Sequence, residues 1–251
     1  MTAGPTHSSA AVDRQPPAAE RARTVALRPT AALHVAGAGT CPVLAATTTG
    51  DGDVLLVVPA AGGAAAALQA SPLGDVPARL TVTDRAPLEL RHPVRALVQL
   101  SGWLTPVPAD DVAGLVLDFA ETSPVDALFE VGLSAVLVRM DLAEVTLEES
   151  GQSVDVDPDD YRAAAPDAVS RVETDLMVAE RRPLSRLCGR VQHWAGRRDD
   201  VRLLGLDRFG VRFRVQSRRG CYDLRVPFAV PLTGPEGFAD AVDHLLTCGP
   251  A

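Results

Sequence analysis

The stretch V-R-A-L-V-Q-L-S-G-W-L-T, residues 94–105, is the most informative for the fold class. Val94, Ala96, Val98, Leu100 and Leu104 recur with a period of two, and most positions between them are polar. Side chains alternate between the two faces of a strand, so this pattern predicts a strand with one buried face. Residues 108–120 follow with apolar residues at helical spacing. The segment therefore predicts a strand that leads directly into a helix.

Short apolar runs separated by turn residues surround this strand. The run at residues 133–147 begins apolar on both faces, which is typical of a strand buried on two sides. The T-G-D-G-D segment before residue 54 indicates a hairpin. Further strands are predicted at residues 31–36, 43–48, 54–58 and 78–83. Many short strands with few helices between them predict an antiparallel barrel or sandwich.

The last hundred residues have a different pattern. D-P-D-D at 157–160 is a helix start, with Asp157 as N-cap and Pro158 in the first helical position. Three strands are predicted at residues 201–206, 211–216 and 222–228, followed by a final helix. This order predicts a small α+β domain of helices, a three-stranded antiparallel sheet and a helix. We expect a disordered tail at 1–16, a first domain at 17–155 and a second at 156–251.

Charge is unevenly distributed along the 251 residues. The net charge is −8 overall. Residues 1–160 contain 9 arginines and 21 acidic residues, whereas residues 161–251 contain 15 arginines and 11 acidic residues. This asymmetry favours two units with different surfaces, and the acidic total argues against nucleic-acid binding. The sequence contains no lysine, which excludes Schiff-base and P-loop lysine chemistry.

The four cysteines show no metal-binding or redox spacing. They are expected to be unpaired thiols. The first twenty residues lack the apolar core of a signal peptide, and no run of about 18 apolar residues could span a bilayer. We therefore expect a cytoplasmic protein without a membrane segment.

Several segments resemble the haem-utilisation family and its actinobacterial relatives. The strongest match is L-L-G-L-D-R-F-G-V-R-F-R-V at 203–215, followed by Y-D-L-R-V-P-F-A-V-P-L at 222–232. L-S-G-W-L-T-P-V at 100–107 is similar to a segment of the first domain of that family. The resemblance implies a pyridoxamine-phosphate-oxidase-like split β-barrel of the FMN-binding type, followed by a small α+β domain. It also implies a homodimer with its ligand at the subunit interface.

The expected flavin site departs from the family pattern. Flavin-binding members carry polar residues after the third strand, but here residues 59–68 read P-A-A-G-G-A-A-A-A-L and offer no side-chain donor. A phosphate needs N–H donors or cations. Arg79 is the nearest cation downstream, and Trp103 is a further candidate for cofactor contact. The alternative interpretation of Arg79 is a surface residue of a strand.

Haem needs an axial ligand, an apolar slot and cations for its propionates. His193 lies beside Trp194 and near Arg190, and Arg197 and Arg198 follow it. His193 or His244 is therefore a candidate axial ligand, although the histidine-rich segment of haem-utilisation relatives is absent. The alternative is that these residues form a solvated helix end within an arginine-rich region.

Three functions remain open at this point. The first is a non-enzymatic or degenerate haem-utilisation-like protein that binds haem, another tetrapyrrole or a protein partner. The second is an FMN- or haem-dependent oxidoreductase. The third is a cofactor-free regulatory adaptor. No G-x-S-x-G, H-E-x-x-H or strand-linked G-x-G-x-x-G motif supports an enzyme, so the first function is favoured, with haem preferred to FMN.

Overall fold

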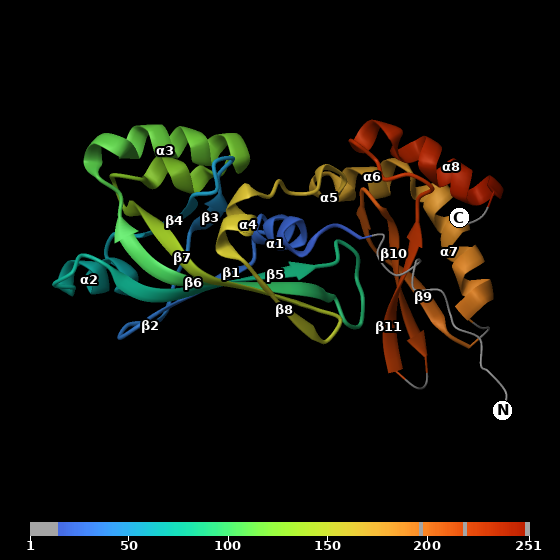
Figure 1. Cartoon of the computed structure of the whole chain (residues 1–251), viewed down its shortest axis with the longest axis horizontal. Helices are drawn as coiled ribbons and strands as arrows, with labels where there is room; N and C mark the ends of the chain where they lie inside the picture. Colours follow the sequence, from blue (N-terminus) through green and yellow to red (C-terminus); the bar gives the residue numbers. More distant parts are fainter. Residues whose placement is uncertain (1–14, 196–197, 218–219, 249–251) are drawn as a thin grey trace, which may run out of the picture. The chain divides into compact units, whose positions relative to one another are not determined.

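The computed structural model describes residues 15–195, 198–217 and 220–248. The described part of the chain divides into two compact units: Ala18–Asp167 is one, and the described residues from Ala168 onward form the other. Both are of α+β type, an antiparallel split β-barrel and a smaller unit with a three-stranded sheet (Figure 1). The fold class expected from the sequence is confirmed.

The barrel unit contains one curled antiparallel sheet. Its strands are β1 (Ala31–Val35), β2 (Gly39–Cys41), β3 (Ala45–Thr48), β4 (Val54–Pro59), β5 (Val76–Arg85), β6 (Val94–Pro106), β7 (Ala135–Glu149) and β8 (Gln152–Val156). Its helices are α1 (Ala18–Ala26), α2 (Gly63–Ala70), α3 (Ala109–Thr122), the 3₁₀ turn η2 (Asp126–Glu130) and α4 (Pro158–Ala163). The strand order is β2-β1-β5-β6-β7-β4-β3, and β8 pairs with β7.

Strand β4 is buried on both of its faces. Val54, Leu56 and Val58 belong to the core enclosed by the curled sheet. Leu55 and Val57 point to the opposite face, where they pack under α3. The continuous V-L-L-V-V run is therefore explained by two separate cores. The start of β7 is likewise buried on both sides, as its sequence predicted.

From Ala96 onward, alternation along β6 follows the predicted period of two, but Val94, which was expected on the buried face, is 42% exposed. Ala96, Val98, Leu100 and Leu104 are buried. The register on β7 shifts between Ser101 and Gly102, which is a β-bulge. Gly102 lies so close to β7 that an added Cβ would overlap the carbonyl oxygen of Asp141. The glycine of L-S-G-W-L-T-P-V is thus required by backbone packing.

A buried arginine ties α1 to the rest of the barrel unit. Arg23 is 3% exposed, its Nε donates to the carbonyl of Ala164 at 2.9 Å and its Nη2 donates to that of Thr49 at 2.8 Å. Its guanidinium lies 5.4 Å from the ring centroid of Tyr161. The Tyr161 hydroxyl in turn shares a 2.7 Å hydrogen bond with the hydroxyl of Thr48. Burial raises the pKa of Tyr161, and Thr48 and Arg23 partly oppose this shift.

The second unit places helices on one three-stranded sheet. It comprises α5 (Ala168–Arg171), α6 (Glu173–Ala179), α7 (Arg181–Ala195), β9 (Asp200–Asp207), β10 (Gly210–Ser217), β11 (Gly220–Pro227), η3 (Pro235–Gly237) and α8 (Phe238–Cys248). The strand order is β11-β10-β9, with antiparallel pairing throughout. Val211, Phe213 and Val215 of β10 face the helices and are fully buried. The predicted order of elements is confirmed.

The G-L-D-R-F-G segment has a structural role in this unit. The carboxylate of Asp207 accepts a hydrogen bond from the backbone N–H of Phe209 at 2.9 Å and also pairs with Arg225. A Cβ at Gly210 would overlap the carbonyl oxygen of Val226 on β11. These contacts hold the β9–β10 turn against β11. The motif that carries the family resemblance is therefore explained by folding requirements.

Three sequence-based expectations need correction. Asp157 caps α4 as predicted, accepting from the N–H groups of Asp159 and Asp160, but α4 packs on α1 and β7, so the unit boundary lies after Asp167 and not at 156. A cap identifies where a helix begins but not which core receives it. Strands β2 and β8 were not predicted, because they lack the apolar alternation of buried strands. Arg95 lies between Val94 and Ala96, where the period of two predicts an exposed polar face, yet it is buried and pairs with Asp84 at 2.6 Å.

Replacing Gly102 by alanine should destabilise the protein by about 3 kcal/mol, because the new methyl group forces the β6–β7 bulge apart. Gly114 is the matched control, since it lies in α3 and a Cβ there meets no atom within 4 Å. Gly114→Ala should be neutral or stabilise by about 0.5–1 kcal/mol. Urea unfolding measures both changes. Equal stability of the two variants would contradict the packing argument.

Tyr161 should make stability fall at alkaline pH. Because its folded pKa lies above the ordinary value of 10.0, the unfolded chain loses the phenol proton first and stability decreases as pH rises through 10. Tyr161→Phe should be less stable than wild type near pH 8, by about 1 kcal/mol for the lost hydrogen bond to Thr48. The difference should shrink by about pH 11. A difference in unfolding free energy that stays constant across this range would contradict the assignment.

Candidate functional site

Helix α7 divides into an apolar face and a basic face. Leu184, Leu187 and Val191 are buried against the three-stranded sheet. Pro183 lies in the first turn, where a missing N–H costs no hydrogen bond. The exposed side carries Arg186, Arg190 and His193 at helical spacing, and α7 contains no acidic residue. The basic charge of this face is therefore not neutralised within the helix.

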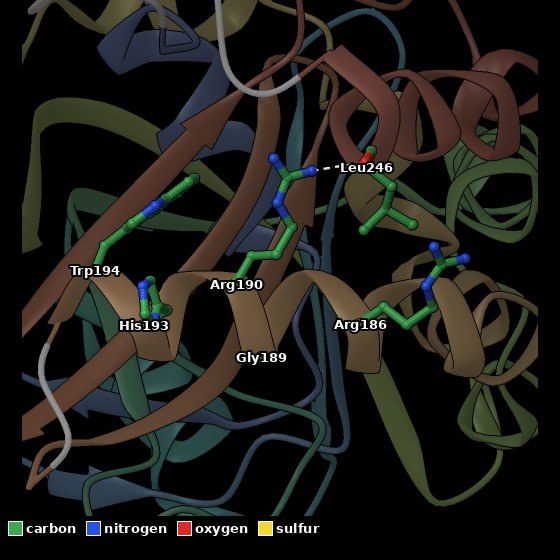
Figure 2. A pocket seen from close by; sticks show the side chains of 6 residues that line it. All are labelled: Arg186, Gly189, Arg190, His193, Trp194 and Leu246. Carbon is green, nitrogen blue, oxygen red and sulfur yellow. Dashed lines mark hydrogen bonds between the residues drawn. The ribbon is translucent and has the colours of Figure 1, made fainter.

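A depression of about 470 Å³ lies between α7 and α8. Figure 2 shows the side chains that line it. They are Arg186, Gly189, Arg190, His193, Trp194 and Leu246. The absence of a side chain at Gly189 leaves room between the basic residues on either side. The depression is lined by His193 and Trp194, which are neighbours in the sequence, and by Arg186 and Arg190 from earlier turns of α7.

Arg190 is held by the end of α8. Its Nη1 donates to the carbonyl oxygens of Leu245 at 2.9 Å and Leu246 at 2.7 Å (Figure 2). The last carbonyls of a helix lack partners within the helix and carry the negative end of its dipole. No basic residue of α8 lies in its own last turn. Arg190 thus supplies the positive charge that stabilises the C-terminal end of α8, and its role is structural.

The other polar groups of the depression are available for a ligand. Among the residues that the structure describes, the side chains of Arg186 and His193 have no hydrogen-bond or ion-pair partner. Trp194 is 50% exposed and adds an aromatic surface. The site therefore offers an imidazole nitrogen, a guanidinium and an aromatic face to one bound molecule.

The remaining predicted residues of this region are placed less favourably. Arg198 is exposed beyond the end of α7, and Arg197 lies outside the described residues. His244 is exposed on α8 and does not line the depression. Of the two candidate axial ligands, only His193 is among the residues of this depression.

Arg79 and Trp103 share the outer face of the barrel sheet. Arg79 on β5 is directly opposite His34 on β1 and Ser101 on β6. Its Nε donates to the Ser101 hydroxyl at 3.2 Å. Trp103 is 44% exposed and lies opposite Pro77, two residues from Arg79 along β5. The structure therefore brings these two candidates to one face, but not to the depression that His193 lines.

The segment expected to hold a flavin phosphate does not fit that group. Residues 59–68 form the end of β4 and most of α2, where Ala64, Ala65 and Leu68 are buried. None of them has a side-chain donor. The guanidinium of Arg79 is directed to Ser101 on the outer face. An anionic phosphate would therefore lack the charged side-chain partners that it needs here.

The described residues contain neither a metal-binding cluster nor a membrane-spanning helix. No group of three or more histidine, cysteine, aspartate or glutamate side chains there could hold a metal ion. None of the described helices has the length and apolar character needed to cross a membrane. The four cysteines are unpaired. Burial raises the pKa of the Cys188 thiol, which does not favour a reactive thiolate.

Sequence reasoning missed Arg186 and Leu246. Arg186 could have been found from helical spacing, because it lies seven residues before His193 and thus on the same face of α7. Leu246 comes from α8, more than fifty residues later in the chain, and no local pattern indicates it.

Comparison with known proteins supports the fold. No family model matches the chain. The structure is similar to that of a heme binding protein from Mycobacterium smegmatis, with a TM-score of 0.61 and 19% identity over 94% of this chain and 98% of that one. This likeness extends over both units and shows a shared fold.

A curated relative is the chloroplastic glutamyl-tRNA reductase-binding protein of Arabidopsis thaliana. It is 28% identical over 120 residues, which are 47% of this chain and 37% of the relative. The chain thus matches little more than a third of that protein's length.

Arg190 and Arg186 should differ sharply in their effect on stability. Arg190→Ala should cost about 1–3 kcal/mol, because it leaves two helix-terminal carbonyls without their charged donor. Arg186→Ala should change stability by less than about 0.5 kcal/mol. Chemical unfolding monitored by far-UV circular dichroism tests both. A neutral Arg190→Ala would show that α8 does not depend on this contact.

Proposed function

We propose that this protein is a non-enzymatic haem- or tetrapyrrole-binding protein whose ligand occupies the depression between α7 and α8. The observation that carries the proposal is the convergence of His193, Arg186 and Trp194 on one depression, in a fold shared with a heme binding protein. Haem sites are commonly formed by these three kinds of contact: an iron ligand such as a histidine nitrogen, a cation for a propionate and an apolar surface.

Each lining residue has a defined role in this proposal. His193 would hold the haem iron through an imidazole nitrogen, and the bound haem would supply the iron centre. Arg186 would pair with a propionate, because guanidinium forms bidentate contacts with carboxylates. Trp194 and Leu246 would cover part of the macrocycle. Arg190 would hold the end of α8, and with it Leu246, beside α7.

A second candidate function is the binding of a protein partner. It is favoured by the similarity to a protein named for its binding of glutamyl-tRNA reductase. The two functions are compatible, because a ligand-binding protein can also act as an adaptor. A flavin-dependent oxidoreductase has less support, because residues 59–68 lack charged or polar side chains for a phosphate.

Haem titration of the purified protein tests the proposal. Wild type should develop a Soret band, and His193→Ala should shift the band and weaken binding at least tenfold, about 1.4 kcal/mol. Arg186→Ala should weaken binding several-fold without shifting the band, because it leaves the axial ligand in place.

His244→Ala is the matched control, since it removes an exposed histidine from α8 outside the depression. It should bind haem like wild type. If His193→Ala leaves both the spectrum and the affinity unchanged, the site is wrong. If wild type gains no Soret band, haem binding itself is wrong.

A further inference from the structure

The barrel unit contains an apolar cavity of about 300 Å³ that haem binding does not use. It lies where α2, the end of β6, the start of α3 and the start of β7 meet. Its walls are formed by Ala65, Leu68, Gln69, Pro106, Val107, Ala109, Val112, Val131, Gly132, Val136, Leu137 and Val138. Gln69 alone among them has a polar side chain. The cavity therefore suits an apolar group and not a polar small molecule.

Two large apolar side chains are exposed beside this cavity. Phe129 and Leu133 are each 80% exposed, and between them in sequence lie Val131 and Gly132, which line the cavity. Fully exposed aromatic and aliphatic residues next to an apolar hollow are typical of protein-interaction sites. Phe129 and Leu133 thus extend the apolar surface beyond the cavity.

The segment that carries these residues is held by its own backbone. The N–H of Gly132 donates to the carbonyl of Ala135 at 2.9 Å, and the N–H of Ser134 donates to that of Glu130 at 3.1 Å. Gly132 adopts a φ of 84°, which favours glycine. A surface formed in advance loses less entropy when a partner binds.

The charge around the cavity is mostly acidic in the neighbouring sequence, and Arg139, which follows the lining residue Val138, pairs with Asp53 at 3.6 Å. From residue 96 to residue 138 the chain contains no arginine, lysine or histidine. The acidic residues of that segment are Asp110, Asp111, Asp118, Glu121, Asp126 and Glu130. Asp110 and Asp111 lie in the first turn of α3, between the lining residues Ala109 and Val112. Helix α2, the opposite wall, has no charged residue.

We propose that this cavity is the docking site for a basic segment of another protein, which inserts one large apolar side chain and places arginine or lysine residues against α3. The apolar lining favours a large apolar side chain, and the nearby acidic residues favour basic residues on either side of it. Such electrostatic complementarity raises the association rate and the specificity of an interface. This inference rests on the partner-binding function and is independent of haem binding.

Fluorescence anisotropy with labelled peptides tests the proposal. The probes have the sequence Arg-Arg-Ala-X-Ala-Arg-Arg, with leucine, phenylalanine, methionine, tryptophan or alanine at X, and a matched set has glutamate in place of arginine. At least one large apolar X should bind wild type about tenfold more tightly than alanine at X. The glutamate set should not bind. Failure of every basic probe to bind at millimolar concentration would overturn the proposal.

Variants that fill the cavity locate the binding. Ala109→Trp enters it from α3 and Gln69→Trp from α2, and both positions are exposed, so neither change disrupts a core. Each should weaken the best probe at least tenfold while haem titration stays unchanged. If both variants bind the best probe with the affinity of wild type, the proposal is overturned. Asp110→Asn with Asp111→Asn should weaken binding more than the control pair Asp118→Asn with Glu121→Gln.

Sedimentation velocity separates a foreign partner from a second copy of this chain. The proposal expects the same oligomeric state for wild type, Ala109→Trp and Gln69→Trp. If wild type is a dimer and both tryptophan variants are monomers, a second copy covers the cavity, and the proposal of a foreign basic partner is overturned.

Discussion

The barrel unit depends on the burial of β4 from both sides. Its five residues Val54 to Val58 are each 1% exposed or less. One set of side chains fills the interior of the curled sheet, and the other set is covered by α3, with Ala127 and Leu128 of η2 also packed against this second core. At about 25 cal/mol per Å² of apolar surface removed from water, such a strand contributes several kcal/mol on each face. The positions of α3 and of the following η2 turn are consequences of this requirement.

In this lysine-free chain, many of the arginine side chains form buried ion pairs and hydrogen bonds that hold the fold together. Arg23 joins α1 to two backbone carbonyls, Arg95 pairs with buried Asp84, and Arg214 on β10 pairs with Asp223 on β11 at 2.8 Å. A guanidinium with five donors can join several acceptors at once, which suits such ties. A high arginine content is thus weak evidence for an anion site. What distinguishes Arg186 is that it lines the depression while its guanidinium has no hydrogen-bond or ion-pair partner among the described residues.

The two units offer chemically opposite surfaces. The depression of the second unit is basic and aromatic, and the cavity of the barrel unit is apolar with acidic surroundings. This contrast corresponds to the net charges of −12 for residues 1–160 and +4 for residues 161–251, from 9 arginines against 21 acids and 15 against 11. The two proposals together assign an anionic ligand and a basic partner to separate places on one chain.

The sequence by itself determined the elements whose signals are local. The period of two in β6, the apolar run of β4 and the Asp157 cap depend on residues within a few positions of one another, so they could be predicted. Half of the candidate site was equally accessible, because His193, Trp194 and Arg190 lie within one helix. The tertiary structure alone decided that α4 joins the barrel core, that Arg190 is engaged by α8, and that Val112 and Val136 line one cavity. These outcomes depend on contacts between segments far apart in the chain, which hydrophobic periodicity and capping do not encode.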